Sequence, residues 1–231
     1  MEDAQYTKYY VAFLDILGFK NLVSGPESTC QSILNIYRRF GSMKNTFYSK
    51  IPEGLQEVNI KVMSDSICVY IEADKPNALW SLIVFCMSFQ YVLLTMPQHI
   101  LLRGAITLGD MFIEDDIVFG PALTQAYLLE EKNAKVPRII ILKETLDYGK
   151  SQTDKNFIET MEASTFRDDD AFYTLNYFLF LFILNDDKRK IESVKAAVSH
   201  CLDTINDESI RQKYLYVEKN IRKFLKENPN A

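Results

Sequence analysis

Two aspartates in this sequence lie where a predicted strand gives way to a turn. Asp15 follows the apolar run at residues 9–14, and Asp65 follows the strand-like run at residues 59–63. An ionised carboxylate at the end of a buried strand costs desolvation free energy unless a partner charge compensates it. Divalent cations prefer oxygen ligands and would supply that charge. With Gly18 close behind Asp15, the pair predicts a magnesium–nucleotide site.

The composition is that of a folded protein with a substantial core. The chain has 231 residues, of which 48% are hydrophobic and 13% aromatic, and no composition shift divides it. This indicates one domain, or a domain with a helical tail. A net charge of −5 without a basic cluster argues against nucleic-acid binding. It does not exclude a nucleotide, because a metal ion neutralises phosphates locally.

The sequence lacks the features of a signal peptide and of a membrane span. The apolar residues 78–96 are interrupted by polar side chains and predict a core helix, and residues 172–184 are too few to cross a bilayer as a helix. Four cysteines without paired spacing and two histidines make a zinc site improbable. We therefore expect a cytoplasmic protein with reduced thiols and no membrane partner.

The predicted elements form a ferredoxin-like palm of the α+β class, an antiparallel sheet with helices packed on one face. In this layout the first strand and the following hairpin are neighbours, so that Asp15 and Asp65 meet although they lie far apart in the sequence. The pair Gly109-Asp110 predicts a turn directly after the expected strand at residues 100–108. We expect strands at residues 9–14, 59–63, 66–71, 100–108 and 138–142, and helices at residues 28–42, 77–95, 120–132, 187–205 and 209–226.

Three motifs resemble the class III nucleotide cyclase catalytic domain. They are Asp15-Ile16-Leu17-Gly18-Phe19, Lys61-x-x-x-Asp65 and Arg103-Gly104-Ala105-Ile106-x-x-Gly109, and the resemblance covers roughly residues 7–145. It implies that the two aspartates hold two Mg²⁺ or Mn²⁺ ions, one activating the ribose 3′-hydroxyl and the other holding the triphosphate. Attack on the α-phosphate would release pyrophosphate and leave a 3′,5′-cyclic nucleotide.

The resemblance also implies roles for the surrounding residues. The carbonyl of Ile16 would complete a metal shell, and amides of the turn at Gly18 and Phe19 would point at the β- and γ-phosphates. Lys61 and Arg103 would contact base or phosphate across a homodimer with composite sites. From the residues alone, Lys61 reads alternatively as a solvent-facing strand residue, and Arg103 as one half of a structural salt bridge.

Departures from the family pattern bear on the base. Purine-selective members commonly combine a Lys four residues before the second aspartate with a later Asp. Lys61 fits the first position, but the later Asp falls on Ile117, with Asp115 and Asp116 close by. An Asn and an Arg that assist the transition state are also missing. Their positions fall on Thr124 and Leu128.

These departures favour a compact bacterial branch, the pyrimidine cyclases of Pycsar antiphage systems. That resemblance implies UTP or CTP as substrate, cUMP or cCMP as product, and a separate effector protein that reads the signal. Alternatives are a purine cyclase or a catalytically inactive nucleotide-binding module. We expect a catalytic domain at residues 1–185 and a helical extension of the same domain at 186–231. The motifs that carry this resemblance are residues 13–19, 64–66, 102–106 and 120–130.

Some further residues are weaker candidates. Thr107 and Asp110 lie near the Arg103 motif, and Arg138 and Lys143 are either cations for the triphosphate or ordinary surface charge. The acidic residues 168–170 read as a solvated turn. The aromatics at residues 172–182 are predicted to lie in the core or in a dimer interface. Exposed apolar surface around residues 100–130 is the expected interface of the dimer.

Overall fold

The computed structural model describes residues 4–25, 30–31, 33–38, 53–183 and 189–228. The strands are β1 (Thr7–Ile16), β2 (Asn59–Met63), β3 (Ser66–Glu72), β4 (Leu102–Glu114), β5 (Ile117–Phe119), β6 (Ile139–Ile141), β7 (Thr165–Arg167) and β8 (Tyr173–Leu175). The helices are α1 (Phe19–Ser24), α3 (Ala78–Thr95), α4 (Pro121–Asn133), α5 (Lys143–Ser151), α6 (Lys155–Ala163), η1 (Tyr177–Leu179), α7 (Phe180–Ile183), α8 (Arg189–Thr204) and α9 (Glu208–Glu227).

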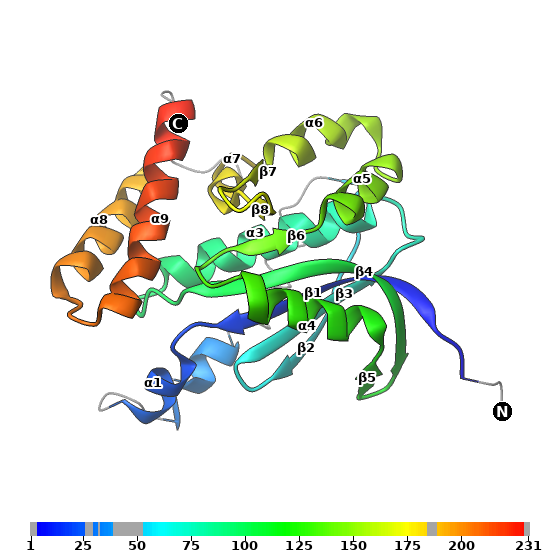
Figure 1. The fold of residues 1–231 in the computed structure, drawn as a ribbon, viewed down its shortest axis with the longest axis horizontal. Coiled ribbons are helices and arrows are strands. Elements are labelled where there is room, and N and C mark those ends of the chain that lie inside the picture. Colours follow the sequence, from blue (N-terminus) through cyan, green and yellow to red (C-terminus); the bar gives the residue numbers. More distant parts are fainter. Residues whose placement is uncertain (1–3, 26–29, 32, 39–52, 184–188, 229–231) are drawn as a thin grey trace.

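One mostly antiparallel sheet organises the chain, in the order β2-β3-β1-β4-β6-β8-β7, with β5 paired to β4. β1 is antiparallel to both β3 and β4, and β4 and β6 form a parallel pair. The arrangement is the α+β palm expected from the order of elements, and Figure 1 shows the long β1 and β4 crossing the middle of the molecule. The predicted neighbourhood of the first strand and the following hairpin is confirmed.

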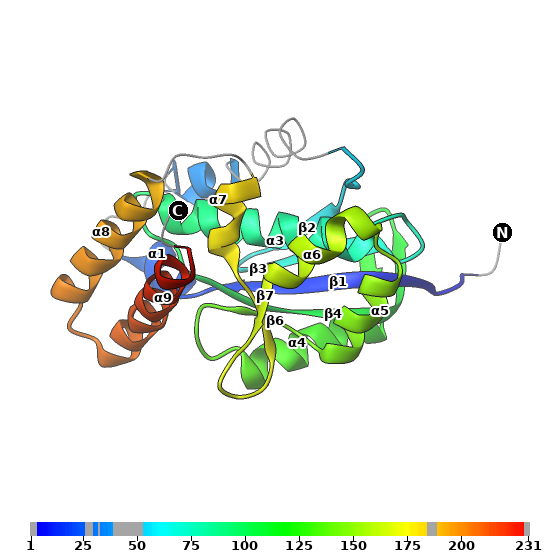
Figure 2. The ribbon, with the colours of Figure 1, turned by 90° about the horizontal axis from the view of Figure 1, so that it is seen from above.

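Helices cover both faces of the sheet, so the expected one-sided packing is wrong. Tyr10 and Leu14 of β1 belong to the large core that includes α3, whereas Val11 and Phe13 pack with residues of α4. Successive side chains of a strand point to opposite faces, which explains the alternation. Figure 2 shows α3 and α4 on opposite sides of β1 and β4. A strand covered on both sides reads as a continuous apolar run, as residues 9–14 do.

Most predicted elements lie where the sequence placed them, but the fourth strand is longer than expected. Gly109 and Asp110 do not form a turn, because they continue the β1–β4 ladder opposite Tyr9 and Lys8. The chain reverses instead at Asp115, where φ is 49°, and β5 then pairs back on β4. Of the helix expected at 28–42, residues 30–31 and 33–38 are helical, and the remainder lies outside the described residues.

Helix α3 is long and apolar enough to cross a membrane, with a mean hydropathy of 1.8 over 18 residues. It is instead a core helix, because 89% of that stretch is buried inside the protein. Among the described residues it is the one helix that passes the test of length and composition. The sequence-based interpretation of this segment as core is confirmed.

The acidic turn after β7 is not simply solvated, and Arg138 is not a surface charge. Arg138 is buried, and its guanidinium donates to Asp168 at 2.8 Å and to Asp170. The hydroxyl of Tyr216 on α9 donates to the same Asp168 oxygen at 2.6 Å. Burial alone would raise the pKa of Asp168, but hydrogen bonds from Tyr216, the Asp169 amide and Arg138 lower it below its usual value. The turn therefore ties α9 to the sheet.

Removing the Asp168 charge should destabilise the protein. We expect Asp168→Asn to lower the free energy of unfolding by about 3 kcal/mol at pH 7, because it leaves Arg138 underpaired in a buried site. The stabilisation from a carboxyl with a lowered pKa is present at neutral pH and lost on acidification below about pH 4. Urea denaturation at both pH values measures this.

The adjacent Asp169 provides the matched control. Its side chain is exposed and pairs with the exposed Lys219. Asp169→Asn should therefore change the free energy of unfolding by less than about 0.5 kcal/mol. Equal effects of the two substitutions would contradict a buried ion-pair role for Asp168.

Candidate functional site

The end of β1 brings the two predicted aspartates to one place. Asp15 pairs in register with Ser66 of β3 on one side and with Arg103 of β4 on the other. The next amide, that of Ile16, donates to the carbonyl of Asp65 at 3.0 Å. The backbones of Asp15 and Asp65 are therefore neighbours, as the palm layout predicted.

The predicted turn at Gly18 is present after β1, and its glycine has a left-handed backbone conformation. Gly18 has φ 77° and ψ 16°, a left-handed conformation that favours glycine. Nothing lies within 4 Å of where a Cβ would be, so the glycine is needed for its backbone angles and faces open space. The short helix α1 begins at Phe19. The amides of Asn21 and Leu22 donate to the carbonyl of Gly18 at 2.9 and 3.2 Å, whereas the amides of Phe19 and Lys20 precede the first intrahelical hydrogen bond.

Tyr37, in the helical segment at residues 33–38, joins the two turns. The hydroxyl of Tyr37 donates to the carbonyl of Ser64 at 2.6 Å, next to Asp65. Its ring packs edge-on against Phe19, with centroids 6.4 Å apart. Burial, and then the charge of Asp65, raise the pKa of Tyr37 above its usual value. Tyr37 thus connects the turn at Phe19 with the turn at Asp65.

Asp15 lies in an ion cluster with Arg103 and Glu130. The Nε of Arg103 donates to Asp15 Oδ2 at 2.8 Å and lies 2.7 Å from Glu130 Oε1. The Asp15 side chain is 18% exposed, so one edge of it faces solvent. The structural salt bridge considered for Arg103 is present. The Arg103 guanidinium supplies the positive charge that offsets the desolvation of the Asp15 carboxylate.

Glu130 is the member of the cluster that sequence reasoning missed. It lies on the buried face of α4 with Ala126 and Ala122, which are four and eight residues before it. Burial raises the pKa of the Glu130 carboxyl to about 7, against the opposing effect of Arg103, and the charge of Asp15 raises it further. The signal for it was present in the sequence, because a glutamate continuing a stripe of small residues at a four-residue spacing points inward.

The donor set suits a hard divalent cation. Asp15 and Asp65 offer carboxylate oxygens, and Ile16 offers a carbonyl at the strand end. With Glu130 ionised, the carboxylates of Asp15 and Glu130 share one guanidinium, which leaves net negative charge for a cation to neutralise. In the described part of the chain no cluster of three or more acidic, His or Cys side chains forms a ready cage. Backbone, water or substrate oxygens would have to complete the shell, as is usual for Mg²⁺.

Lys61 reaches away from Asp15 and binds the β4–β5 hairpin. Its Nζ donates to Asp116 Oδ1 at 2.7 Å and to the carbonyl of Asp115 at 2.8 Å. The hydrogen bond to Asp116 raises the pKa of Lys61. The motif alignment placed the later Asp of purine-selective cyclases at Ile117. The carboxylate that Lys61 contacts belongs to Asp116, one residue earlier, so the alignment missed this pair. A Lys–Asp pair is therefore present on this edge of the sheet.

The weaker candidates make ordinary structural contacts. Thr107 is buried, and its hydroxyl donates to the carbonyl of Ala122 at 2.9 Å. Lys143 forms an exposed ion pair with Asp147 one turn along α5. Asp110 is exposed near the far end of the β1–β4 ladder. These contacts give none of the three a place beside Asp15.

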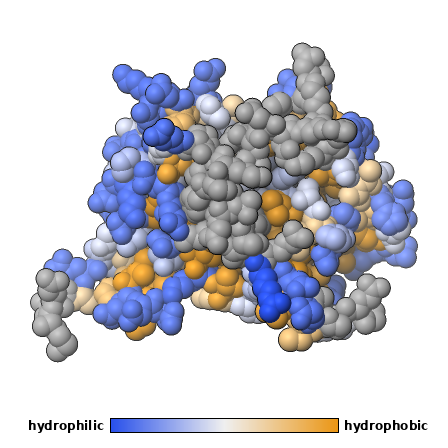
Figure 3. All heavy atoms as spheres, turned by 180° about the vertical axis from the view of Figure 1, so that it is seen from behind, coloured by the Kyte–Doolittle hydropathy of each residue, from blue (hydrophilic) through white to orange (hydrophobic). Residues whose placement is uncertain are grey.

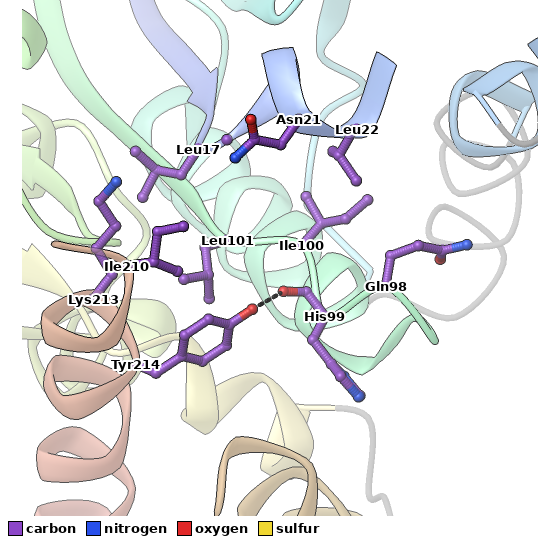
Figure 4. Close-up of a pocket in the computed structure, with 11 residues that line it drawn as sticks. Leu17, Asn21, Leu22, Gln98, His99, Ile100, Leu101, Ile210, Lys213 and Tyr214 are labelled. Carbon is purple, nitrogen blue, oxygen red and sulfur yellow. Dashed lines mark hydrogen bonds between the residues drawn. The ribbon is translucent and has the colours of Figure 1, made fainter. Parts of the chain in front are cut away.

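A cavity of about 230 Å³ lies beside the Gly18 turn (Figure 4). Leu17 and Gly18 line one side, and Lys213 and Tyr214 of α9 line another. The Tyr214 hydroxyl donates to the carbonyl of His99 at 3.1 Å, the contact drawn as a dashed line. Helix α9 therefore packs next to the turn that follows Asp15.

Solved structures share this architecture. The adenylyl cyclase CyaB from P. aeruginosa aligns with a TM-score of 0.54 at 18% identity, over 75% of this chain and 95% of that one. The chain has the fold of a class III nucleotide cyclase catalytic domain. The guanylyl cyclase domain of the RhoGC fusion protein from the aquatic fungus Blastocladiella emersonii aligns with a TM-score of 0.53 at 14% identity, over 74% and 96%. No protein-family model and no curated protein sequence matches the chain.

The raised pKa of Glu130 predicts a pH-dependent stability. A carboxyl whose folded pKa is about 7 stabilises the fold while protonated, and this contribution is lost as the pH rises through 7. Between pH 5 and pH 8 in EDTA, wild type should lose up to about 3 kcal/mol of unfolding free energy relative to Glu130→Gln. Urea denaturation measures the difference.

Glu131 is the matched control, because it is the next residue of α4 and is exposed. Glu131→Gln should follow the wild-type pH dependence. Parallel pH profiles for wild type and Glu130→Gln would show that Glu130 has an ordinary pKa.

Proposed function

We propose that this chain is a nucleotide cyclase that converts a nucleoside triphosphate to a 3′,5′-cyclic nucleotide and pyrophosphate. The observation that carries the proposal is the meeting of Asp15 and Asp65 at the end of β1, beside the left-handed Gly18 turn. The fold shared with an adenylyl and a guanylyl cyclase supports it. We assign catalysis to residues 1–185, and residues 186–231 to a helical extension of the same domain.

The residues at the strand ends divide the work of an in-line displacement at phosphorus. Asp15, Asp65 and the Ile16 carbonyl would hold two Mg²⁺ or Mn²⁺ ions, which supply charge that acidifies the 3′-hydroxyl and stabilises the departing pyrophosphate. The turn at Gly18 and Phe19 presents backbone amides to the β- and γ-phosphates. These groups position the substrate and exclude alternative geometries, a contribution that lowers the barrier without covalent chemistry.

Two positively charged side chains, those of Arg103 and Lys61, complete the proposed site. Arg103 lies at the strand end, where the two terminal nitrogens of its guanidinium can pair with phosphate oxygens while its Nε stays bonded to a carboxylate. Lys61 lies on β2, held by Asp116, and we assign it to base or phosphate contact across a dimer. Both roles follow from the motif resemblance, and both need a second subunit to bring the groups together.

For the base, we propose a pyrimidine, with UTP or CTP as substrate and cUMP or cCMP as product. The motifs around Asp15, Asp65 and Arg103 support this, as does the replacement of the transition-state Asn and Arg by Thr124 and Leu128, both exposed on α4. On the same resemblance, the product is a cytoplasmic antiphage signal read by a separate effector protein.

A purine substrate is the second candidate, and one observation favours it. Lys61 and Asp116 form the kind of Lys–Asp pair with which purine-selective cyclases of this fold recognise the base. This pair weakens the argument for a pyrimidine that was based on Ile117 in place of the later Asp. Only the product formed distinguishes the two bases.

We propose a homodimer, and exposed apolar surface supports it. Ile117 and Phe119 of β5 are 54% and 47% exposed, and Tyr127 and Leu128 extend the surface onto α4. Exposed patches of this kind mark interaction sites. The lower edge of the molecule, where β2 and β5 lie in Figure 1, also shows hydrophobic surface in Figure 3.

The activity is tested with the four nucleoside triphosphates and Mn²⁺. We expect cUMP or cCMP plus pyrophosphate, identified by mass spectrometry. Asp15→Asn or Asp65→Asn should lower kcat at least about a hundredfold, because each removes a ligand worth several kcal/mol of transition-state stabilisation. Asp74→Asn, in the exposed turn after β3, should keep wild-type activity.

Each alternative has its own outcome in this assay. Product from ATP or GTP alone would contradict the pyrimidine assignment and favour the purine cyclase. Nucleotide that binds yet returns unchanged from the wild type would overturn the cyclase proposal in favour of a binding module.

The dimer is tested by placing a charge on the β5 surface. Ile117→Asp should raise the dissociation constant of the dimer at least about tenfold, because it puts a carboxylate into an apolar contact. Activity should fall in parallel at low protein concentration. Sedimentation velocity measures the association.

Tyr148→Asp is the matched control, because Tyr148 is a similarly exposed hydrophobic residue on α5, away from β5. It should leave the dissociation constant unchanged. A monomeric wild type with full activity would contradict the composite site.

A further inference from the structure

One nitrogen lies between two carboxylates in the ion cluster. The Nε of Arg103 carries a single hydrogen, yet Asp15 Oδ2 lies 2.8 Å and Glu130 Oε1 2.7 Å from it. The hydrogen bond goes to Asp15. Glu130 Oε1 is buried without a hydrogen-bond partner among the described residues. Two acceptors therefore compete for one N–H.

The unsatisfied acceptor is in the more buried position. Glu130 is 2% exposed, whereas the Asp15 side chain has an edge open to solvent. A buried carboxylate oxygen without a hydrogen bond is costly, so Glu130 is ready to accept the N–H once Asp15 has another cation as its partner. Because both oxygens are already within bonding distance of Nε, the exchange needs a reorientation of the guanidinium and no movement of the main chain.

We propose that Glu130 is a positioning residue that draws Arg103 off Asp15 when a divalent cation binds there. The inference rests on the proposed metal site. A cation and the guanidinium compete for the same Asp15 carboxylate, since each neutralises one negative charge. When Glu130 can accept the guanidinium of Arg103, a divalent cation replaces Arg103 at Asp15 with little loss of free energy. Without it, Arg103 has no second carboxylate at hand and stays on Asp15.

Binding of Mn²⁺ alone, in the absence of nucleotide, tests the proposal independently of activity. Electron paramagnetic resonance at pH 8 gives the dissociation constant from free Mn²⁺. Glu130→Gln should weaken Mn²⁺ binding roughly tenfold, the usual loss when a residue that orients a metal ligand is removed. Thermal melting confirms that each variant is folded.

Two variants separate contact from charge. Glu130→Asp keeps the charge but is one methylene shorter and should not reach Arg103, so we expect it to bind Mn²⁺ as weakly as Glu130→Gln. Glu131→Gln removes a charge from the neighbouring exposed position and should bind as wild type does.

The outcomes also separate this inference from the proposed function. Asp15→Asn should abolish the binding that wild type shows. Loss of binding in Asp15→Asn together with wild-type affinity in Glu130→Gln or Glu130→Asp would overturn the role of Glu130 alone. A Glu130→Gln effect no larger than that of Glu131→Gln would do the same. Unchanged Mn²⁺ binding in Asp15→Asn would overturn the metal site itself.

Discussion

An ionised carboxylate at the end of a buried strand requires a cation beside it, and this constraint organises the centre of the molecule. Asp15 ends β1, the strand that runs between β3 and β4. Arg103 meets it from β4, and Glu130 approaches from α4 on the same face. The guanidinium is therefore shared between an acid that faces solvent and one that is buried. Any cation bound at Asp15 changes that balance.

Hydrogen bonds from neighbouring segments fix the position of the end of β1. Hydrogen bonds from Ile16 to Asp65 and from Leu17 to Leu101 close both sides of β1 beyond Asp15. Tyr37 joins the two turns, and α9 and Leu17 line the same cavity beside the Gly18 turn. A site for phosphoryl chemistry needs such fixed placement, because most of the rate comes from orientation and preorganised charge. Helix α9 thus lies next to the turn that follows Asp15.

The sequence predicted those parts of the fold and site that depend on local pattern. The apolar run before Asp15 and the hairpin around Asp65 were visible as strands, and the palm order brought the two together. Gly18 was recognisable as a turn residue directly after a strand, although its left-handed conformation was seen only in the structure. Local pattern failed at Gly109-Asp110, a strong turn signal, because ten paired residues of the β1–β4 ladder outweigh the preference of two.

The side-chain partners of individual charged residues in distant segments could not be predicted. The sequence around Arg138 does not indicate that its guanidinium will be buried and paired with Asp168. The pairing of β6 with β8 brings these two residues together. Lys61 and Asp116 are similarly far apart, and an alignment by motif shifted the acidic partner by one residue. Glu130 was passed over because its role depends on Arg103, not on its own motif.

The central claim is that Asp15 and Asp65 jointly hold the metal ions of a nucleotide site. Crystals grown with Mn²⁺ and a UTP analogue that cannot cyclise, measured at the manganese absorption edge, test it most directly. The account predicts anomalous peaks within coordination distance of both carboxylates, with the triphosphate over the Gly18 turn and Arg103 hydrogen-bonded to Glu130. Manganese bound elsewhere, with Arg103 still on Asp15 in the presence of nucleotide, would contradict it.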